Sequence, residues 1–159
     1  MTNGFYKVSA SSRNDRLLQI GEKKWLLIFG FYDDDDIGSY NWRKNYGHKP
    51  TSSEVKSDVE ALVNSMTDER IISGFVWHGI KVWLSAENQM NFKAAYDLAV
   101  QSDGATLPVK FKLGEDDDGV AVYHTFENIE EFSDFYTSAF GWIKQCLNDG
   151  WTEKDGIDY

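Results

Sequence analysis

Residues 74–84, read GFVWHGIKVWL, place two β-rich arms on either side of His78-Gly79. Glycine readily adopts the positive φ that a two-residue turn requires, so this stretch predicts a tight β-hairpin. Alternate residues of a strand point to opposite faces, and the apolar face is then Phe75, Trp77, Ile80, Val82 and Leu84. Val76, Lys81 and Trp83 fall on the other face. Trp83 is therefore the tryptophan that we expect to be exposed or interfacial.

The residues after this hairpin predict a helix and then a second hairpin. Ser85 is a good N-cap, and the helix that it begins should end at Asp103-Gly104. A small-residue face for packing on a sheet is predicted at Met90, Ala94, Ala95, Leu98 and Ala99. The segments LPVKFKLG and GVAVYHTF then form a second hairpin around EDDD, residues 115–118.

The strongest helix signal in the chain follows Asn128. Asn128 can cap the helix, Glu131 completes a capping box, and Gly150 is a good stop. One side of this helix is apolar and consists of Ile129, Phe132, Tyr136, Ala139, Ile143, Cys146 and Leu147. The polar tail after Gly150 has two residues, Ile157 and Tyr159, that could pack back on the body.

The first fifty residues are typical of β-structure. GFYKVSA predicts a short strand, and RLLQIGEKKWLLIFGFY predicts two strands joined at Gly21-Glu22. YNWRKNY, which follows the tip DDDDIGS, alternates aromatic and polar residues and predicts the return strand of a long hairpin. Four adjacent aspartates repel one another, so we place them at a solvated tip.

A helix is predicted from the residue after Pro50. Thr51 can cap it, and Glu54 three positions later completes a capping box. Its narrow apolar stripe consists of Val55, Val59, Leu62 and Met66. Such a stripe fits either packing on the chain's own body or self-association, and we favour the former.

The fold class that follows is α+β, with antiparallel β-hairpins packed against three helices and preceded by an N-terminal β meander or long hairpin. We divide the chain into an N-terminal β segment at 1–50, a connecting helix at 51–70 and a compact β-β-α-β-β-α domain at 71–159. With 159 residues, such a chain can fold without a metal or a disulfide.

The amino-acid composition limits the classes of partner that the chain can bind. A net charge of −10 without a cluster of Lys and Arg argues against direct nucleic-acid binding. The single cysteine, Cys146, excludes an internal disulfide framework and a cysteine-based zinc site, and we interpret it as a buried, inert thiol. The sequence shows neither a signal peptide nor a membrane span, so we expect a virion or bacterial cytoplasmic location and no membrane partner.

Signals for catalysis and metal binding are weak. The acidic loops at 33–36 and 115–118 do not match a calcium loop, because Ile37 and Gly119 stand at the wrong positions, and whether they hold a cation stays open. His48, His78 and His124 lack the paired spacing of a zinc site. No nucleophile elbow or phosphate loop is present, and abundant carboxylates are not evidence for an acid–base pair. We expect no metal, no cofactor and no catalytic residue.

The six tryptophans raise a second possibility, because aromatic faces bind sugars and peptides by stacking. Core packing explains most of them better, since large aromatic side chains are mostly buried. Trp42 and Trp83 are the two that we would assign to a glycan- or host-surface-binding module.

The hairpin, the capped helix, the second hairpin and the long final helix together resemble a domain family of unknown function found at the ends of phage and prophage tail-fibre genes. The resemblance covers about residues 70–159. It rests on Phe75, Trp77, Gly79, Trp83, Leu84 and Ser85, and on Asn91, Lys93 and Ala94 of the following helix. The helix after Pro50 looks like the helical lead-in that precedes this domain. The family supplies no catalytic residues to carry over.

This resemblance implies a non-enzymatic phage or prophage structural or assembly protein that acts through protein–protein contacts. The partners would be other phage structural or tail proteins, or a second copy of the chain. Because the N-terminal β segment and the helix at 51–66 carry more apolar surface than one small element buries, we expect the contact surface there. The candidate residues are Trp25, Trp42, Tyr46, Val55, Val59, Leu62 and Trp83. The alternatives are a glycan-binding module and a hydrolase of unfamiliar type.

Overall fold

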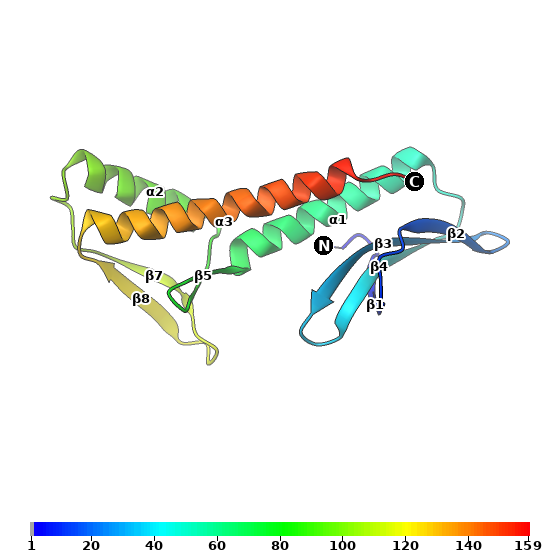
Figure 1. Ribbon diagram of the computed structural model, residues 1–159, viewed down its shortest axis with the longest axis horizontal. Coiled ribbons are helices and arrows are strands. Elements are labelled where there is room, and N and C mark those ends of the chain that lie inside the picture. The colour runs from blue at the N-terminus through cyan, green and yellow to red at the C-terminus, as the bar shows by residue number, and fades with distance from the viewer. Residues whose placement is uncertain (1) are drawn as a thin grey trace. The chain divides into compact units, whose positions relative to one another are not determined.

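The computed structural model describes residues 2–159 and has an α+β fold, which confirms the predicted class (Figure 1). All pairing between its strands is antiparallel. The strands are β1 (Tyr6–Ser9), β2 (Arg16–Gly21), β3 (Lys24–Asp34), β4 (Gly38–Tyr46), β5 (Phe75–Trp77), β6 (Ile80–Val82), β7 (Val109–Glu115) and β8 (Ala121–Phe126). The helices are α1 (Ser52–Ser73), α2 (Ala86–Gln101) and α3 (Ile129–Asp155).

The chain forms two compact units that differ from the predicted division. Unit 1 comprises Met1–Met66 together with Gly150–Tyr159, and unit 2 comprises Thr67–Asp149. The sequence pattern placed the last ten residues with the C-terminal domain, whereas the structure packs Ile157 and Tyr159 against the core of unit 1. Helices α1 and α3 therefore each contribute residues to both units.

Unit 1 is a four-stranded sheet of order β1-β4-β3-β2 with the first part of α1 on one face. The predicted alternation in β4 is confirmed, because Tyr40, Trp42 and Tyr46 are buried on the face toward the helix. Val59 and Leu62 of α1 are fully buried against this face. The α1 stripe thus packs on the chain's own body, as we favoured.

Unit 2 contains the hairpins β5–β6 and β7–β8 together with α2 and most of α3. The hairpin turn forms at His78-Gly79, where φ is 47° and 78°. Its faces are those predicted: Phe75 and Trp77 are buried, whereas Val76 is 55% exposed. The core is a cluster of aromatic rings, in which Phe126 stacks on Phe132 at 4.5 Å and 10°.

The two hairpins of unit 2 meet at β6 and β7. The Trp83 backbone N–H donates to the Leu113 carbonyl at 2.8 Å. Gly114 allows this approach, because a Cβ there would lie 2.3 Å from the carbonyl oxygen of Lys81. A side chain at this position would force the hairpins apart.

All three predicted helix N-caps form. The Thr51 hydroxyl accepts from the Glu54 N–H at 3.1 Å, the Ser85 hydroxyl from Asn88 at 3.2 Å, and Asn128 from Glu131 at 2.9 Å. These caps fix where each helix begins because they satisfy N–H groups that lack a partner within the helix.

One helix prediction was wrong and a second was confirmed only in part. Gly150 does not end α3, which continues to Asp155 with Gly150 buried. The continuation is stabilised by contacts that its last turn makes in unit 1. In α2, the predicted packing face is confirmed at Ala95 and Ala99 but is wrong at Met90 and Leu98, which are 71% and 52% exposed. Phe92 is buried and Tyr96 packs against the same core. The large aromatic rings bury more apolar area than the alanine-rich face would.

Candidate functional site

Most of the predicted interaction surface is interior. Within unit 1 the residues Trp42, Tyr46, Val55, Val59 and Leu62 are at most 6% exposed. Because the sheet and α1 cover one another, these side chains cannot contact a partner while unit 1 is folded. The expectation that they form the contact surface is therefore corrected.

The other two predicted residues, Trp25 and Trp83, lie in different units. Trp25 is half-buried at the edge of the unit 1 core, with the Lys49 ammonium 5.3 Å from its ring centroid. Trp83 lies in unit 2 and is 51% exposed, as the hairpin register predicted. The predicted set thus does not come together as one site.

An apolar groove runs between α2 and α3 in unit 2. Its volume is about 440 Å³. The residues that line it are Leu84, Ala86, Gln89, Met90, Phe92, Lys93, Phe135, Tyr136, Ala139, Phe140 and Ile143. The helices are held beside one another by the ring of Tyr96, which stacks on Tyr136 at 4.6 Å, and by an edge contact of Phe92 with Phe135 at 5.1 Å.

This α2–α3 groove has a rigid base and an exposed apolar rim. Phe92 and Phe135 at its base are no more than 2% exposed, whereas Met90 and Phe140 at its rim are 71% and 57% exposed. Exposed apolar side chains that flank a groove are characteristic of protein-contact sites. Sequence reasoning missed these two residues, although Phe140 lies just off the apolar stripe assigned to the helix and could have been noticed there.

A second groove, of about 700 Å³, lies beside Trp83 where the two hairpins meet the start of α2. We call it the Trp83 groove. It is lined by Ser73, Lys81, Val82, Trp83, Ser85, Glu87, Asn88, Lys112, Leu113, Gly114 and Glu115. In contrast to the α2–α3 groove, its lining combines one aromatic ring with cations, carboxylates and neutral polar groups.

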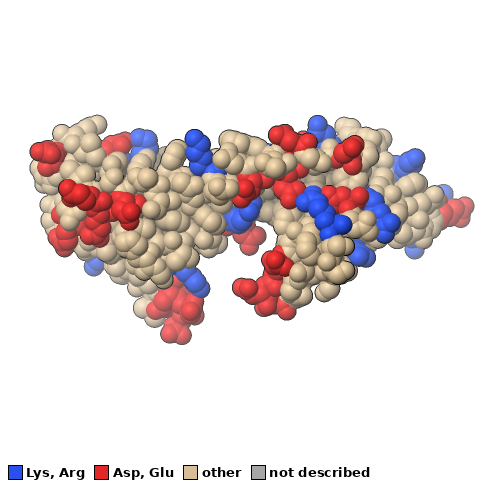
Figure 2. Space-filling model, in the orientation of Figure 1, with Lys and Arg blue, Asp and Glu red and all other residues tan. Residues whose placement is uncertain are grey.

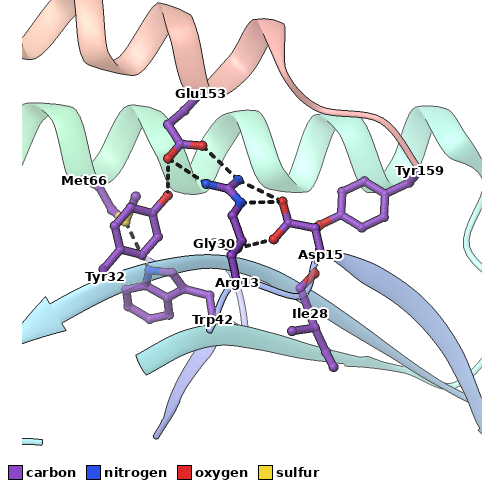
Figure 3. A network of polar contacts seen from close by, with 9 residues as sticks. All are labelled: Arg13, Asp15, Ile28, Gly30, Tyr32, Trp42, Met66, Glu153 and Tyr159. Carbon is purple, nitrogen blue, oxygen red and sulfur yellow. Dashed lines mark hydrogen bonds and ion pairs between the residues drawn. The ribbon is translucent and has the colours of Figure 1, made fainter. Parts of the chain in front are cut away.

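Unit 1 contains a polar network centred on Arg13 (Figure 3). The guanidinium donates to both carboxylate oxygens of Glu153, at 3.1 and 3.0 Å, and to Asp15 at 2.9 Å. The Tyr32 hydroxyl donates to Glu153 at 3.2 Å, and Asp15 also accepts from the Gly30 N–H at 2.7 Å. Burial, followed by the nearby carboxylate of Glu153, raises the pKa of the Tyr32 hydroxyl.

The polar groups of this network form their hydrogen bonds with one another. Glu153 comes from the last turn of α3, and Arg13 and Asp15 precede β2, so the contacts join the end of the chain to its beginning. Tyr159 strengthens the same junction because its hydroxyl donates to the Ile28 carbonyl at 2.8 Å. We interpret the network as the structural link that closes unit 1.

Two histidines flank Trp77 in unit 2. His78 stacks on the indole at 4.1 Å, and His124 meets its edge at 5.1 Å. The indole N–H donates to Asp134 at 3.0 Å, and His124 pairs with Glu131. The two carboxylates belong to α3, so the cluster fastens both hairpins to the start of that helix.

Residues 115–118 are exposed, as the sequence predicted. For residues 33–36 the predicted tip is confirmed only at Asp35 and Asp36, because Asp33 and Asp34 are the last residues of β3 and pair with Ser39 and Gly38 of β4. Figure 2 shows acidic patches at the β3–β4 and β7–β8 tips. Over residues 2–159, no three His, Cys, Asp or Glu side chains gather as a metal ion would require. In the same part of the chain, no helix is long and apolar enough to cross a membrane.

No family model matches the sequence, and no curated protein or solved structure is significantly similar to it. The resemblance to the phage tail-associated family therefore stays a prediction.

Proposed function

We propose that this chain is a non-enzymatic structural or assembly protein of a phage or prophage, located in the virion or in the host cytoplasm during assembly. It acts by contact with other phage structural or tail proteins, and self-association is the second form of contact. The proposal rests on the sequence resemblance of residues 70–159 and on one structural observation, the apolar α2–α3 groove with its exposed rim.

The α2–α3 groove supports protein contact through its shape and chemistry. Met90 and Phe140 place large apolar side chains in water at the two sides of a groove whose base is already packed. Covering them with a partner removes apolar area from water, which favours association by about 25 cal/mol per Å² before the costs of binding. A groove between two helices suits an apolar helix or extended segment of the partner.

The protein content of purified phage particles tests the proposal directly. Mass spectrometry of gradient-purified particles from cells that encode the chain should detect it if it is a virion component. If it is instead an assembly factor, particles should lack it and deletion of its gene should lower the yield of infective particles. Particles that lack the chain and form normally without it would contradict the proposal.

The groove can be tested by one added charge. Phe140→Asp should abolish incorporation or assembly, because a carboxylate in the covered rim would be buried without a partner. Val120→Asp is the matched control, since Val120 is 59% exposed in the β7–β8 turn and lies outside the groove. Equal effects of both variants, or none of either, would remove the groove from the proposal.

A further inference from the structure

The Trp83 groove has features that protein contact through α2–α3 does not explain. Trp83 and Trp77 belong to the same short hairpin, yet Trp77 is 4% exposed and Trp83 is 51% exposed. The core of unit 2 is complete without the Trp83 indole, which lies on the outer face of the hairpin. A tryptophan held half in water beside a groove is available for a ligand.

The backbone holds Trp83 in place from three directions. Its N–H donates to the Leu113 carbonyl at 2.8 Å, and its carbonyl accepts from the Asn88 side chain at 2.8 Å. On either side of it, Val82 and Leu84 are buried in the core. The backbone that carries the indole is therefore fixed directly after β6, and a ligand that stacks on the ring loses little free energy in ordering the site.

The base of the groove lies where β7 meets β6, at Gly114. This residue is buried, and its lack of a side chain lets the backbone of β7 approach the Lys81 carbonyl closely, which joins the two hairpins beneath the groove. The volume of about 700 Å³ lies in the range of small-molecule sites, about 300–1,000 Å³.

The polar lining identifies the chemistry of the ligand. Lys81 and Lys112 supply donors, and Glu87 and Glu115 supply acceptors, so the charges in the lining balance. A phosphate or sulfate site would have an excess of cations, and an apolar ligand would leave these groups without partners. A hydroxyl group both donates and accepts, which suits a lining of this mixed kind.

The lysines are free to reorient toward a ligand. Lys81 pairs with Asp117 at 2.6 Å, and Lys112 pairs with Glu115 at 3.4 Å. All four side chains are between 49% and 85% exposed, and such exposed ion pairs hold their partners weakly.

From these observations we infer that the Trp83 groove binds a neutral carbohydrate, with one sugar ring stacked on the Trp83 indole and its hydroxyls bonded to the charged and polar groups of the groove. An aromatic ring such as the Trp83 indole packs against the C–H face of a sugar ring. The charged and polar side chains of the groove can then form hydrogen bonds with the hydroxyl groups at the edge of the sugar. This inference is independent of the proposed particle role, because neither groove shares its exposed rim with the other.

Binding can be measured on the intact chain with defined sugars. We would screen a glycan array and then follow chitotriose, maltotriose and cellotriose by saturation-transfer NMR, with sialyllactose as the acidic comparison. At least one neutral glycan should bind, and its ring C–H protons should receive the strongest saturation because they face the indole.

Variants assign the binding to the groove. Trp83→Ala should weaken it about tenfold or more, because it removes the stacking surface. Tyr123→Ala is the matched control: Tyr123 is 56% exposed on β8, lies outside the groove, and should leave the affinity unchanged. Thermal unfolding of both variants checks that the fold persists.

Three results would overturn the inference. The first is an array on which no neutral glycan binds. The second is binding that Trp83→Ala leaves intact or that Tyr123→Ala weakens equally. The third is binding restricted to sialylated or sulfated glycans, which would assign recognition to the lysines instead of the indole.

Discussion

Trp42 of unit 1 lies on β4 and Trp83 of unit 2 directly follows β6, but Trp42 is 6% exposed and Trp83 is 51% exposed. In unit 1, a helix covers the aromatic face of the sheet, and the indole N–H of Trp42 reaches the Met66 sulfur at 3.1 Å. In unit 2, the helices cover the opposite face of the hairpin. Which face a helix covers therefore decides whether the indole is exposed, and the α2–α3 groove and the Trp83 groove both belong to unit 2.

The largest expected effect tests whether the α1 stripe is core. Leu62 is 0% exposed, so Leu62→Ala should destabilise the protein by about 2–5 kcal/mol through lost burial and a cavity. Chemical denaturation measures the change. Ile20→Ala, at a residue 54% exposed on β2, should change stability by less than about 0.5 kcal/mol. If the Leu62 variant were as stable as the control, the α1 stripe would not be part of the core of unit 1, and the contrast between the buried Trp42 and the exposed Trp83 would lose its explanation.

The junction of the hairpins in unit 2 gives the next effect. Gly114→Ala would place a Cβ 2.3 Å from the Lys81 carbonyl oxygen, and we expect a cost of about 1–3 kcal/mol as the strands shift. Gly141→Ala in α3 meets no atom within 4 Å and should stabilise the protein by about 0.5–1 kcal/mol. Thermal unfolding of the pair should move in opposite directions, and a shift of the same sign would contradict the close approach of β6 and β7.

A smaller effect is expected at the network that closes unit 1. Glu153→Gln keeps the shape of the side chain but removes the charge that pairs with Arg13. Because the Arg13 side chain is 43% exposed and solvent screens the pair, the loss should be about 1 kcal/mol. The difference between wild type and variant should shrink in high salt. Asp158→Asn, at an exposed position of the same tail, is the control.

The reactivity of the Cys146 thiol tests the packing of α3 in the unaltered chain, without a substitution that could change stability. The Cys146 side chain is 1% exposed, and burial raises the pKa of its thiol above the usual range. Less thiolate is therefore present at a given pH, and access is blocked, so a thiol reagent should react far more slowly with the native chain than with the chain in denaturant. Equal rates would show that unit 2 opens at this helix.

The features that could be predicted from the sequence are those that depend on neighbours along the chain. The turn at His78-Gly79 and the caps at Thr51, Ser85 and Asn128 each need only a few adjacent residues. For the same reason, the two faces of β5–β6 followed directly from their alternation.

The features that could not be predicted depend on segments far apart in sequence. Gly150 has the local chemistry of a helix end, but contacts of Glu153 and Tyr159 with residues near the start of the chain carry α3 past it. Similarly, the sequence marks Val55 and Leu62 as apolar without indicating what covers them. Met90 was missed because α2 turns a different face inward than its small residues suggested, and Phe140 was missed because it lies just off the apolar stripe assigned to α3.

The composition of unit 1 sets an order of events during synthesis. Its sheet and the first half of α1 are made early, but Glu153, Ile157 and Tyr159 complete it only after residues 67–149 have been translated. All residues of unit 2 are therefore synthesised before unit 1 is complete, and the core around the earliest strands stays unfinished until residues 150–159 have been added. A chain that ends at Asp149 keeps every residue of unit 2 but lacks Glu153, Ile157 and Tyr159, so its N-terminal sheet should be sensitive to protease while residues 67–149 stay resistant.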